Sequence, residues 1–189
     1  MTKTSLISTA ILFIMTLVIV PTQFAFAQVL PCENPVLADL VAGQHTDSGD
    51  VSVCNEADTL YVQYATVDGW LMTETHLVVE QHPESIPQMG SGNPKIGHFT
   101  YQRTYTPGTN EDTYEIDLSG LGLVEGDEIV IAAHAVVQLA DEEGNLIQQE
   151  TAWGDGEDFA GRNWATYITY TLQSGTPNGG GDGGDGGGR

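Results

Sequence analysis

Positive charge is scarce in this chain. Only five Lys and Arg residues stand against 26 Asp and Glu residues, which gives a formal net charge of −21 over 189 residues. Nucleic acids and anionic membrane surfaces are polyanions that proteins bind through Lys and Arg, so this charge balance argues against both as partners. The excess of acidic residues favours solubility, and a specific role in cation binding is the alternative interpretation.

Cysteine is also rare, with Cys32 and Cys54 as its two residues. In an exported protein an even pair usually forms a disulfide, and we expect one here. Closing a loop of about 20 residues stabilises a fold by roughly 3 kcal/mol. Two thiol ligands for a metal ion are the alternative, but the C-x-x-C spacing is missing and His45 is the only histidine nearby.

Familiar catalytic signatures are missing as well. The chain contains no G-x-S-x-G, phosphate-binding loop, dinucleotide fingerprint or H-E-x-x-H sequence. Its many acidic residues include pairs suited to glycoside hydrolysis, but nothing in the sequence selects one pair. The sequence therefore favours a noncatalytic role over an enzymatic one.

The N-terminus has the three regions of a secretory signal peptide. Lys3 supplies the positive charge, an apolar run covers 7–20, and Ala25-Phe26-Ala27 has small residues at the positions required for cleavage. We therefore expect a signal peptide over 1–27, a secreted or cell-surface protein, and no membrane insertion after cleavage. An uncleaved anchor is the alternative, but the apolar run is shorter than the about 20 residues of a spanning helix, and Pro21 follows it.

Alternating apolar and polar residues predict an all-β fold. The alternation recurs between clusters of Gly, Pro, Asn and Asp, whereas no stretch sustains a helical stripe over three turns. About eight strands favour an antiparallel β-sandwich or jelly roll. Asp68-Gly69 and Glu143-Gly144-Asn145 are typical of hairpin turns, and 128–139 is apolar on both faces, as in a central, covered strand. The expected strands cover 50–55, 59–66, 70–80, 98–105, 113–118, 128–139, 146–153 and 163–173.

The chain length suits one domain, which we place at 28–173. Within it, 81–97 contains three prolines and is predicted to be a long loop, a kind of segment that often carries function. Residues 174–189 are rich in Gly and Asp and are predicted to be a flexible linker or tail, either a short tether or a connection to a further part of a longer protein. This segment lacks the apolar residues of calcium-binding β-roll repeats.

Histidines and glutamates on the predicted strands form the first candidate site. Glu74 and His76 share one face of a strand, His134 lies in the middle of another, and Glu150 lies near the end of a third. If these strands are neighbours, the four side chains form a polar cluster whose residue types suit zinc. A metal-dependent hydrolase with an open coordination position and a structural network around a buried histidine are both open interpretations.

Acidic residues of a loop form the second candidate site. Asp155, Glu157 and Asp158 lie within four residues of each other, and carboxylate oxygens are the ligands that calcium prefers. Asp47 or Asp50 would complete such a site if the loops meet. The alternative is that these are solvated acidic residues of turns.

Aromatic residues on strands offer flat surfaces on which sugars stack, although most strand aromatics pack in a core. Trp153 is the strongest candidate among the three tryptophans because it precedes the loop 154–161, where we expect its ring to be partly exposed. A carbohydrate-binding module is therefore a further alternative. The turn at Gln44 and His45 supplies additional candidate recognition groups.

Seven short sequences together resemble a module of exported bacterial and archaeal surface proteins. They are AGQ (42–44), LYVQY (60–64), ETHL (74–77), GNPKIG (92–97), IAAHA (131–135), ETAWG (150–154) and NWATY (163–167). The resemblance spans 37–172 and implies an extracellular setting, without an established activity or catalytic residue. We therefore expect a noncatalytic secreted or cell-surface module with a binding or architectural role, whose partners are cell-surface components, glycans or other protein modules.

Overall fold

The computed structural model describes residues 29–32 and 34–174, and the fold in these ranges is all β, which confirms the predicted class. The predicted signal peptide and residues 175–189 lie outside the described residues. No helix in the described ranges is long and apolar enough to cross a membrane.

The strands are β1 (Val36–Ala42), β2 (Thr46–Glu56), β3 (Thr59–Thr66), β4 (Trp70–Glu80), β5 (Tyr101–Thr109), β6 (Glu111–Asp117), β7 (Glu128–Ala140), β8 (Leu146–Gly154), β9 (Glu157–Asp158) and β10 (Thr166–Thr171), with 3-10 turns η1 (Pro83–Ser85), η2 (Ile96–His98) and η3 (Ser119–Leu121).

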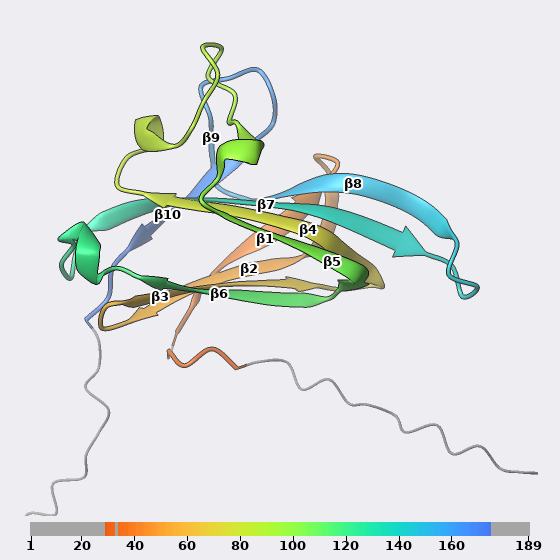
Figure 1. The fold of residues 1–189 in the computed structure, drawn as a ribbon, viewed down its shortest axis with the longest axis horizontal. Helices are drawn as coiled ribbons and strands as arrows, with labels where there is room; N and C mark the ends of the chain where they lie inside the picture. Colours follow the sequence, from red (N-terminus) through yellow and green to blue (C-terminus); the bar gives the residue numbers. More distant parts are fainter. Residues whose placement is uncertain (1–28, 33, 175–189) are drawn as a thin grey trace, which may run out of the picture.

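The strands form one antiparallel sheet that curves back on itself. Its order is β5-β4-β7-β8-β1-β2-β3-β6, and β10 pairs with β7 and β9. The curvature places β5, β4, β7 and β8 in one layer over β1, β2, β3 and β6 (Figure 1). Because the end strands β5 and β6 are consecutive in sequence, with only Asn110 between them, the sheet is nearly closed into a barrel.

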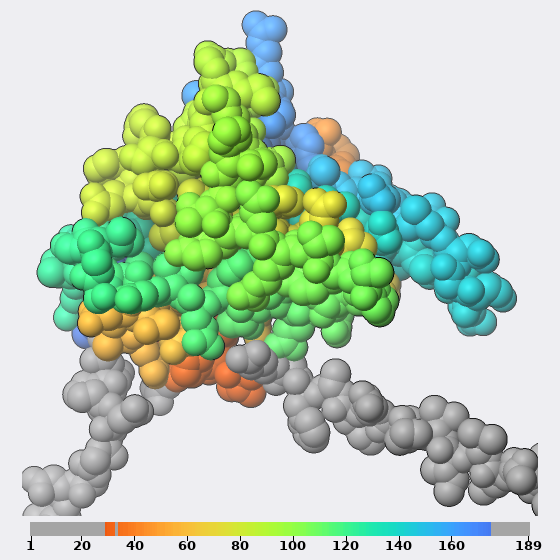
Figure 2. Space-filling view, viewed as in Figure 1, coloured from red at the N-terminus to blue at the C-terminus, as the bar shows by residue number. Residues whose placement is uncertain are grey.

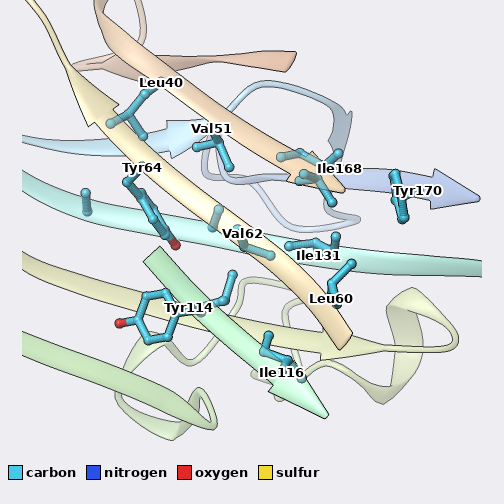
Figure 3. Packing of buried hydrophobic residues seen from close by; sticks show 14 of the residues in the cluster. Leu40, Val51, Leu60, Val62, Tyr64, Tyr114, Ile116, Ile131, Ile168 and Tyr170 are labelled. Atoms are coloured by element: carbon cyan, nitrogen blue, oxygen red, sulfur yellow. The ribbon is translucent and has the colours of Figure 1, made fainter. Parts of the chain in front are cut away.

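The main core lies between these two layers, and strand alternation builds it. In β3 every second side chain is buried, beginning with Leu60 and Val62. Burying a large aliphatic side chain contributes about 1.5–3 kcal/mol, so the core is the main source of stability. Figure 3 labels ten of its members, Leu40, Val51, Leu60, Val62, Tyr64, Tyr114, Ile116, Ile131, Ile168 and Tyr170.

β7 is the central, covered strand that the sequence predicts. It pairs with β4 on one edge and with β8 and β10 on the other. Ile131 and Ala133 face the main core, whereas Val130 and Ala132 belong to a second apolar cluster on the outer face of the upper layer. Both faces of β7 are therefore packed, which explains why its sequence is apolar throughout.

Two loops cover this second cluster, and we call them together the cap. They are 81–100, which contains the predicted long loop, and 155–165, and they rise side by side above the sheet (Figure 2). The side-chain oxygen of Asn93 joins them, since it accepts hydrogen bonds from the backbone N–H groups of Arg162 (2.8 Å) and Asn163 (3.2 Å). The cap buries Phe99 and Phe159 against the sheet.

The strand predictions miss β1 and the connection between β3 and β4. Asp68 and Gly69 adopt left-handed φ values of 53° and 85°, as a tight turn requires, but β3 and β4 are not neighbours in the sheet. The predicted hairpin is therefore wrong, and the turn carries the chain from one layer to the other. The second predicted hairpin is confirmed, since β7 and β8 pair on either side of Gly144.

A disulfide joins Cys32 to Cys54, with their Cα atoms 6.1 Å apart, which confirms the predicted pairing. Cys54 belongs to β2 and is buried, so the bond attaches the segment before β1 to the sheet.

The end strands β5 and β6 are not paired with each other, and we call the gap between them the seam. Side chains bridge this seam. Arg103 on β5 donates to the carboxylate of Asp112 on β6 and to the carbonyl oxygen of Thr113, and its guanidinium lies 4.1 Å from the centre of the Tyr114 ring. The hydroxyl of Thr75 on β4 donates a further hydrogen bond of 2.8 Å to Asp112. Strand pairing is thus replaced at the seam by a polar network around one buried carboxylate.

Candidate functional site

Three rings lie in a row on the outer face of the upper layer. His76 on β4 is directly opposite His134 on β7, and His134 is opposite Trp153 on β8. Opposite residues in an antiparallel pair share a face, so the three rings are neighbours. The Nδ1 atoms of the two histidines are 3.3 Å apart, and the centres of the His134 and Trp153 rings are 4.8 Å apart.

The histidine pair is held in its neutral form. Burial, with the neighbouring His76, lowers the pKa of His134 to about 3. Burial also lowers the pKa of His76, although Glu74, with its carboxylate 3.9 Å from Nε2 of His76, opposes this shift. One imidazole therefore donates its Nδ1–H to the other, while the buried Nε2 of His134 has no hydrogen-bond partner among the described residues.

Glu150 does not join the histidines, so the predicted four-residue cluster is not formed. Alternation places Glu150 on the same face of β8 as Ala152, in the main core, whereas Trp153 faces outward. Glu150 instead accepts a hydrogen bond of 3.2 Å from Gln148. In the described ranges, no group of three or more His, Cys, Asp or Glu side chains is placed to hold a metal ion.

The predicted calcium ligands also separate. Glu157 accepts hydrogen bonds from the hydroxyls of Tyr167 (3.2 Å) and Thr169 (2.9 Å), both on β10. Asp155 and Asp158 line a pocket that Glu157 does not reach. The separation arises because 157–158 is a strand, in which consecutive side chains point to opposite faces.

The two other acidic residues considered for that site lie on β2. Asp47 accepts a hydrogen bond of 3.0 Å from the backbone N–H of Gly49, and Asp50 is opposite Asp39 on β1. Partial burial, together with the charges of Asp47 and Asp39, raises the pKa of Asp50. These carboxylates therefore repel one another across the β1–β2 pair.

A pocket of about 280 Å³ lies beside the cap, next to the turn between β1 and β2. It brings together five side chains that the sequence singles out for different reasons, although they are spread over more than 100 residues. Trp164, from the second loop of the cap, adds an indole wall. The lining residues are Val41, Gln44, His45, Trp153, Asp155, Asp158, Trp164 and Thr166.

The prediction of an exposed Trp153 ring is wrong. The side chain is 3% exposed, because the cap folds back over it and packs Phe99 and Phe159 against the indole, with ring centres 6.2 and 6.4 Å away. The indole N–H has no hydrogen-bond partner among the described residues, and it is not one of the fully buried polar atoms that lack a partner there. Trp153 therefore lines the pocket as a buried ring and offers no exposed stacking face.

Several polar side chains that line the pocket have no hydrogen-bond partner among the described residues. The carboxylates of Asp155 and Asp158 form no hydrogen bond or ion pair within the described part of the chain, and the same holds for the side chains of Gln44 and His45. Gln44 is fixed by a left-handed backbone with φ of 76° in the turn after β1. The hydroxyl of Thr166 is already used, since it donates to the carbonyl oxygen of Gly154. No Lys or Arg of the described ranges lines the pocket.

Six of the seven short sequences behind the resemblance gather around this outer layer and its cap. ETHL and IAAHA supply the histidine pair, ETAWG and NWATY supply the two pocket tryptophans, and AGQ forms the turn at the pocket rim. GNPKIG contains Asn93, the residue that joins the cap loops. The residue set thus marks one region of the molecule.

In comparisons with known proteins, no family model, curated protein or solved structure matches this chain. The fold and the site define an all-β, disulfide-bonded protein with a capped outer cluster and a polar pocket beside it. Since one fold supports many functions, the function has to be argued from the pocket's side chains.

Proposed function

We propose that the chain is a noncatalytic binding module of a secreted or cell-surface protein, and that it binds a neutral saccharide in the pocket beside the cap. The observation that carries the proposal is that one pocket is lined by polar residues whose side chains have no partner among the described residues, namely Gln44, Asp155 and Asp158. Polar groups placed at a pocket without partners favour a ligand that supplies them.

A polyhydroxylated ligand matches this set of groups. Each hydroxyl donates to a carboxylate while accepting from an N–H group, so a sugar satisfies both kinds of group at once. Trp164 adds an indole surface for the apolar face of a sugar ring. The volume of about 280 Å³ lies just below the ~300–1,000 Å³ of typical small-molecule pockets, which suits a ligand the size of a single sugar ring.

The charge of the site determines which ligand charges it can accept. Two carboxylates line the pocket, and the chain as a whole carries a formal net charge of −21. An anionic sugar would be repelled by this field, whereas a neutral sugar is unaffected by it. The proposed ligand class therefore excludes uronic acids and sulfated or phosphorylated sugars.

Two features support an extracellular setting. The sequence of 1–27 has the pattern of a secretory signal peptide, and the Cys32–Cys54 disulfide is of a kind that persists mainly in oxidising compartments. The alternative of a His/Glu hydrolase has less support. Of its two glutamates, Glu74 lies beside His76, but alternation places Glu150 on the opposite face of the sheet from the histidines, and His134 is buried.

The test is a titration of the mature chain with neutral monosaccharides, glucose, galactose and N-acetylglucosamine, followed by tryptophan fluorescence and calorimetry. We expect saturable binding of at least one sugar, reduced about tenfold or more in Trp164→Ala and in the double variant Asp155→Asn/Asp158→Asn, because stacking or a charge-assisted hydrogen bond contributes about 1.5 kcal/mol or more. Asp58→Asn is the matched control, since Asp58 lies at a different pocket. No binding by any of the sugars, or equal binding by the double variant, would overturn the proposal.

A further inference from the structure

The two loops of the cap are joined through the side chain of one residue. Asn93, on the first loop, accepts hydrogen bonds at its side-chain oxygen from the backbone N–H groups of Arg162 (2.8 Å) and Asn163 (3.2 Å), on the second. We propose that Asn93 is the positioning residue of the pocket, because it fixes the loop that carries the Trp164 indole before a ligand arrives. Asn93 does not itself line the pocket. The inference rests on the proposed function and names what keeps that site in its binding shape.

The second loop of the cap supplies three of the pocket's side chains, those of Asp155, Asp158 and Trp164. The base of this loop is held by the pairing of β9 with β10. Beyond the base, in 160–164, the hydrogen bonds that reach other parts of the described chain are the two that Asn93 accepts. Trp164 lies in this part of the loop, so the position of its indole depends on Asn93 and on packing against the second apolar cluster.

The backbones of the two loops also approach closely at this point. A Cβ at Gly161 would lie 2.7 Å from the backbone nitrogen of Asn93, and a Cβ at Gly92 would lie 2.8 Å from the backbone nitrogen of Gly161. Both distances are too short for atoms that are not bonded, so both positions require glycine. The two glycines thus let the side chain of Asn93 reach the N–H groups of the other loop.

Asn93 is itself held in place by its own loop. Its carbonyl oxygen accepts a hydrogen bond of 2.8 Å from the N–H group of Met89, and the N–H group of Gly92 donates one of 2.9 Å to the carbonyl oxygen of Met89. Gln88 and Pro94 form an isolated bridge beside this turn. A side chain on such a fixed backbone loses little freedom when it accepts its two hydrogen bonds, which is the requirement for a site formed in advance.

The experiment compares Asn93→Leu, which is similar in size but lacks an acceptor, with Asn93→Asp, which keeps an acceptor oxygen. Amide hydrogen exchange of the mature chain, followed by NMR without sugar, should be about tenfold faster at Arg162 and Asn163 in Asn93→Leu. The same variant should bind sugar about threefold or more weakly in calorimetry. Asn93→Asp should keep both values close to those of the unaltered chain. Gln88→Leu is the matched control, since Gln88 donates to the carbonyl oxygen of Pro83 within the same loop.

A second variant perturbs the same contact from the other loop. Gly161→Ala pushes Asn93 away and should also accelerate exchange at Asn163 and weaken sugar binding about threefold or more. Gly97→Ala is its control, because Gly97 belongs to the cap and a Cβ there meets no atom within 4 Å. Circular dichroism establishes that all the variants are folded.

Two outcomes overturn the proposal. Unchanged exchange at Arg162 and Asn163 in Asn93→Leu means that Asn93 does not fix the loop, and this measurement needs no sugar. Faster exchange with unchanged sugar affinity means that Asn93 joins the cap loops without positioning the pocket. The proposed function fails differently, when the unaltered chain binds none of the sugars, and the exchange rates then decide by themselves whether Asn93 fixes the loop that carries Trp164.

Discussion

The imidazole of His134 lies edge-on to the indole of Trp153, with ring centres 4.8 Å apart, and Trp153 in turn lines the pocket. The contact is a direct consequence of register, because the two residues are opposite each other in the β7–β8 ladder. A charge on His134 would therefore appear in the second apolar cluster, next to the pocket wall. We therefore expect protonation of His134 at low pH to destabilise the fold.

We expect the free energy of unfolding to fall by about 1.4 kcal/mol per pH unit between pH 6.5 and 5. The pKa of His134 is lowered to about 3 in the folded protein, whereas an unfolded chain has its ordinary value of about 6.5. The unfolded state thus binds more protons in this window, and stability rises with pH through it. The contribution is complete above pH 6.5 and is lost as the pH falls toward 3. Urea unfolding at several pH values measures the slope.

The variant His134→Phe isolates the source of this slope. Phenylalanine keeps a ring against Trp153 but cannot titrate, so the variant should lose most of the dependence between pH 6.5 and 5. His98→Gln serves as the control, because His98 is exposed and its removal should leave the slope unchanged. The assignment to His134 is wrong if His134→Phe keeps the full slope.

The two pocket tryptophans should separate stability from binding. Trp153 is 3% exposed, so Trp153→Ala leaves a cavity beneath the cap and should cost about 3–5 kcal/mol. Trp164 is only half-buried at the edge of the same cluster, and Trp164→Ala should cost about 1 kcal/mol while reducing sugar affinity. Urea unfolding measures the first quantity and calorimetry the second. A larger stability loss in Trp164→Ala than in Trp153→Ala would contradict the described burial.

We expect Arg103 and Asp112 at the seam to stabilise the fold as a coupled pair. Arg103→Met leaves the carboxylate of Asp112, which is 7% exposed, without its cationic partner. We expect a loss of about 1–3 kcal/mol, below the value for a fully buried pair because the Arg103 side chain is 44% exposed. A double-mutant cycle with Asp112→Asn measures the coupling between the two. Additive effects of the two substitutions would show that the pair does not hold the seam closed.

Gly49 is a position where only glycine fits. Its φ is 144°, and a Cβ placed there would lie 1.9 Å from the backbone oxygen of Ala65 on β3. Gly49→Ala should therefore destabilise the protein by about 2 kcal/mol or more. Gly120→Ala is the matched control, because a Cβ at that position meets no atom within 4 Å. Similar unfolding midpoints for the two variants would contradict the close approach of β2 and β3.

Sequence patterns predict local structure well here because strand alternation and turn chemistry are local properties. The segment 128–139 is apolar on both faces, and the corresponding strand β7 is the most enclosed in the sheet. Asp68-Gly69 shows the limit of such patterns, since it forms the expected turn but joins strands in different layers. A turn sequence specifies the reversal of the chain, and the pairing partners depend on the rest of the sheet.

The candidate site shows the same limit. Glu150 and Trp153 are three residues apart on one strand, so alternation places them on opposite faces, but only the register of the β7–β8 pair shows that Trp153, and not Glu150, lies beside His134. No local signal reveals that the cap returns over Trp153, or that Gln44 and Asp158 meet at one pocket. Gln44 and Asp158 are more than 100 residues apart, and Phe99 of the cap is more than 50 residues from Trp153, so only the folded chain determines these contacts.

The disulfide between Cys32 and Cys54 should contribute mainly through the unfolded state. It closes a loop with a sequence separation of 22, for which loop entropy predicts a contribution of about 3 kcal/mol. Reduction, or the double variant Cys32→Ala/Cys54→Ala, should lower the free energy of unfolding by about this amount and leave the pocket intact, because neither cysteine lines it. Urea unfolding with and without reductant makes the measurement, and the double variant should be insensitive to reductant. If reduction also abolishes sugar binding in a chain that remains folded, the segment before β1 positions the pocket, and the bond acts on the folded state as well.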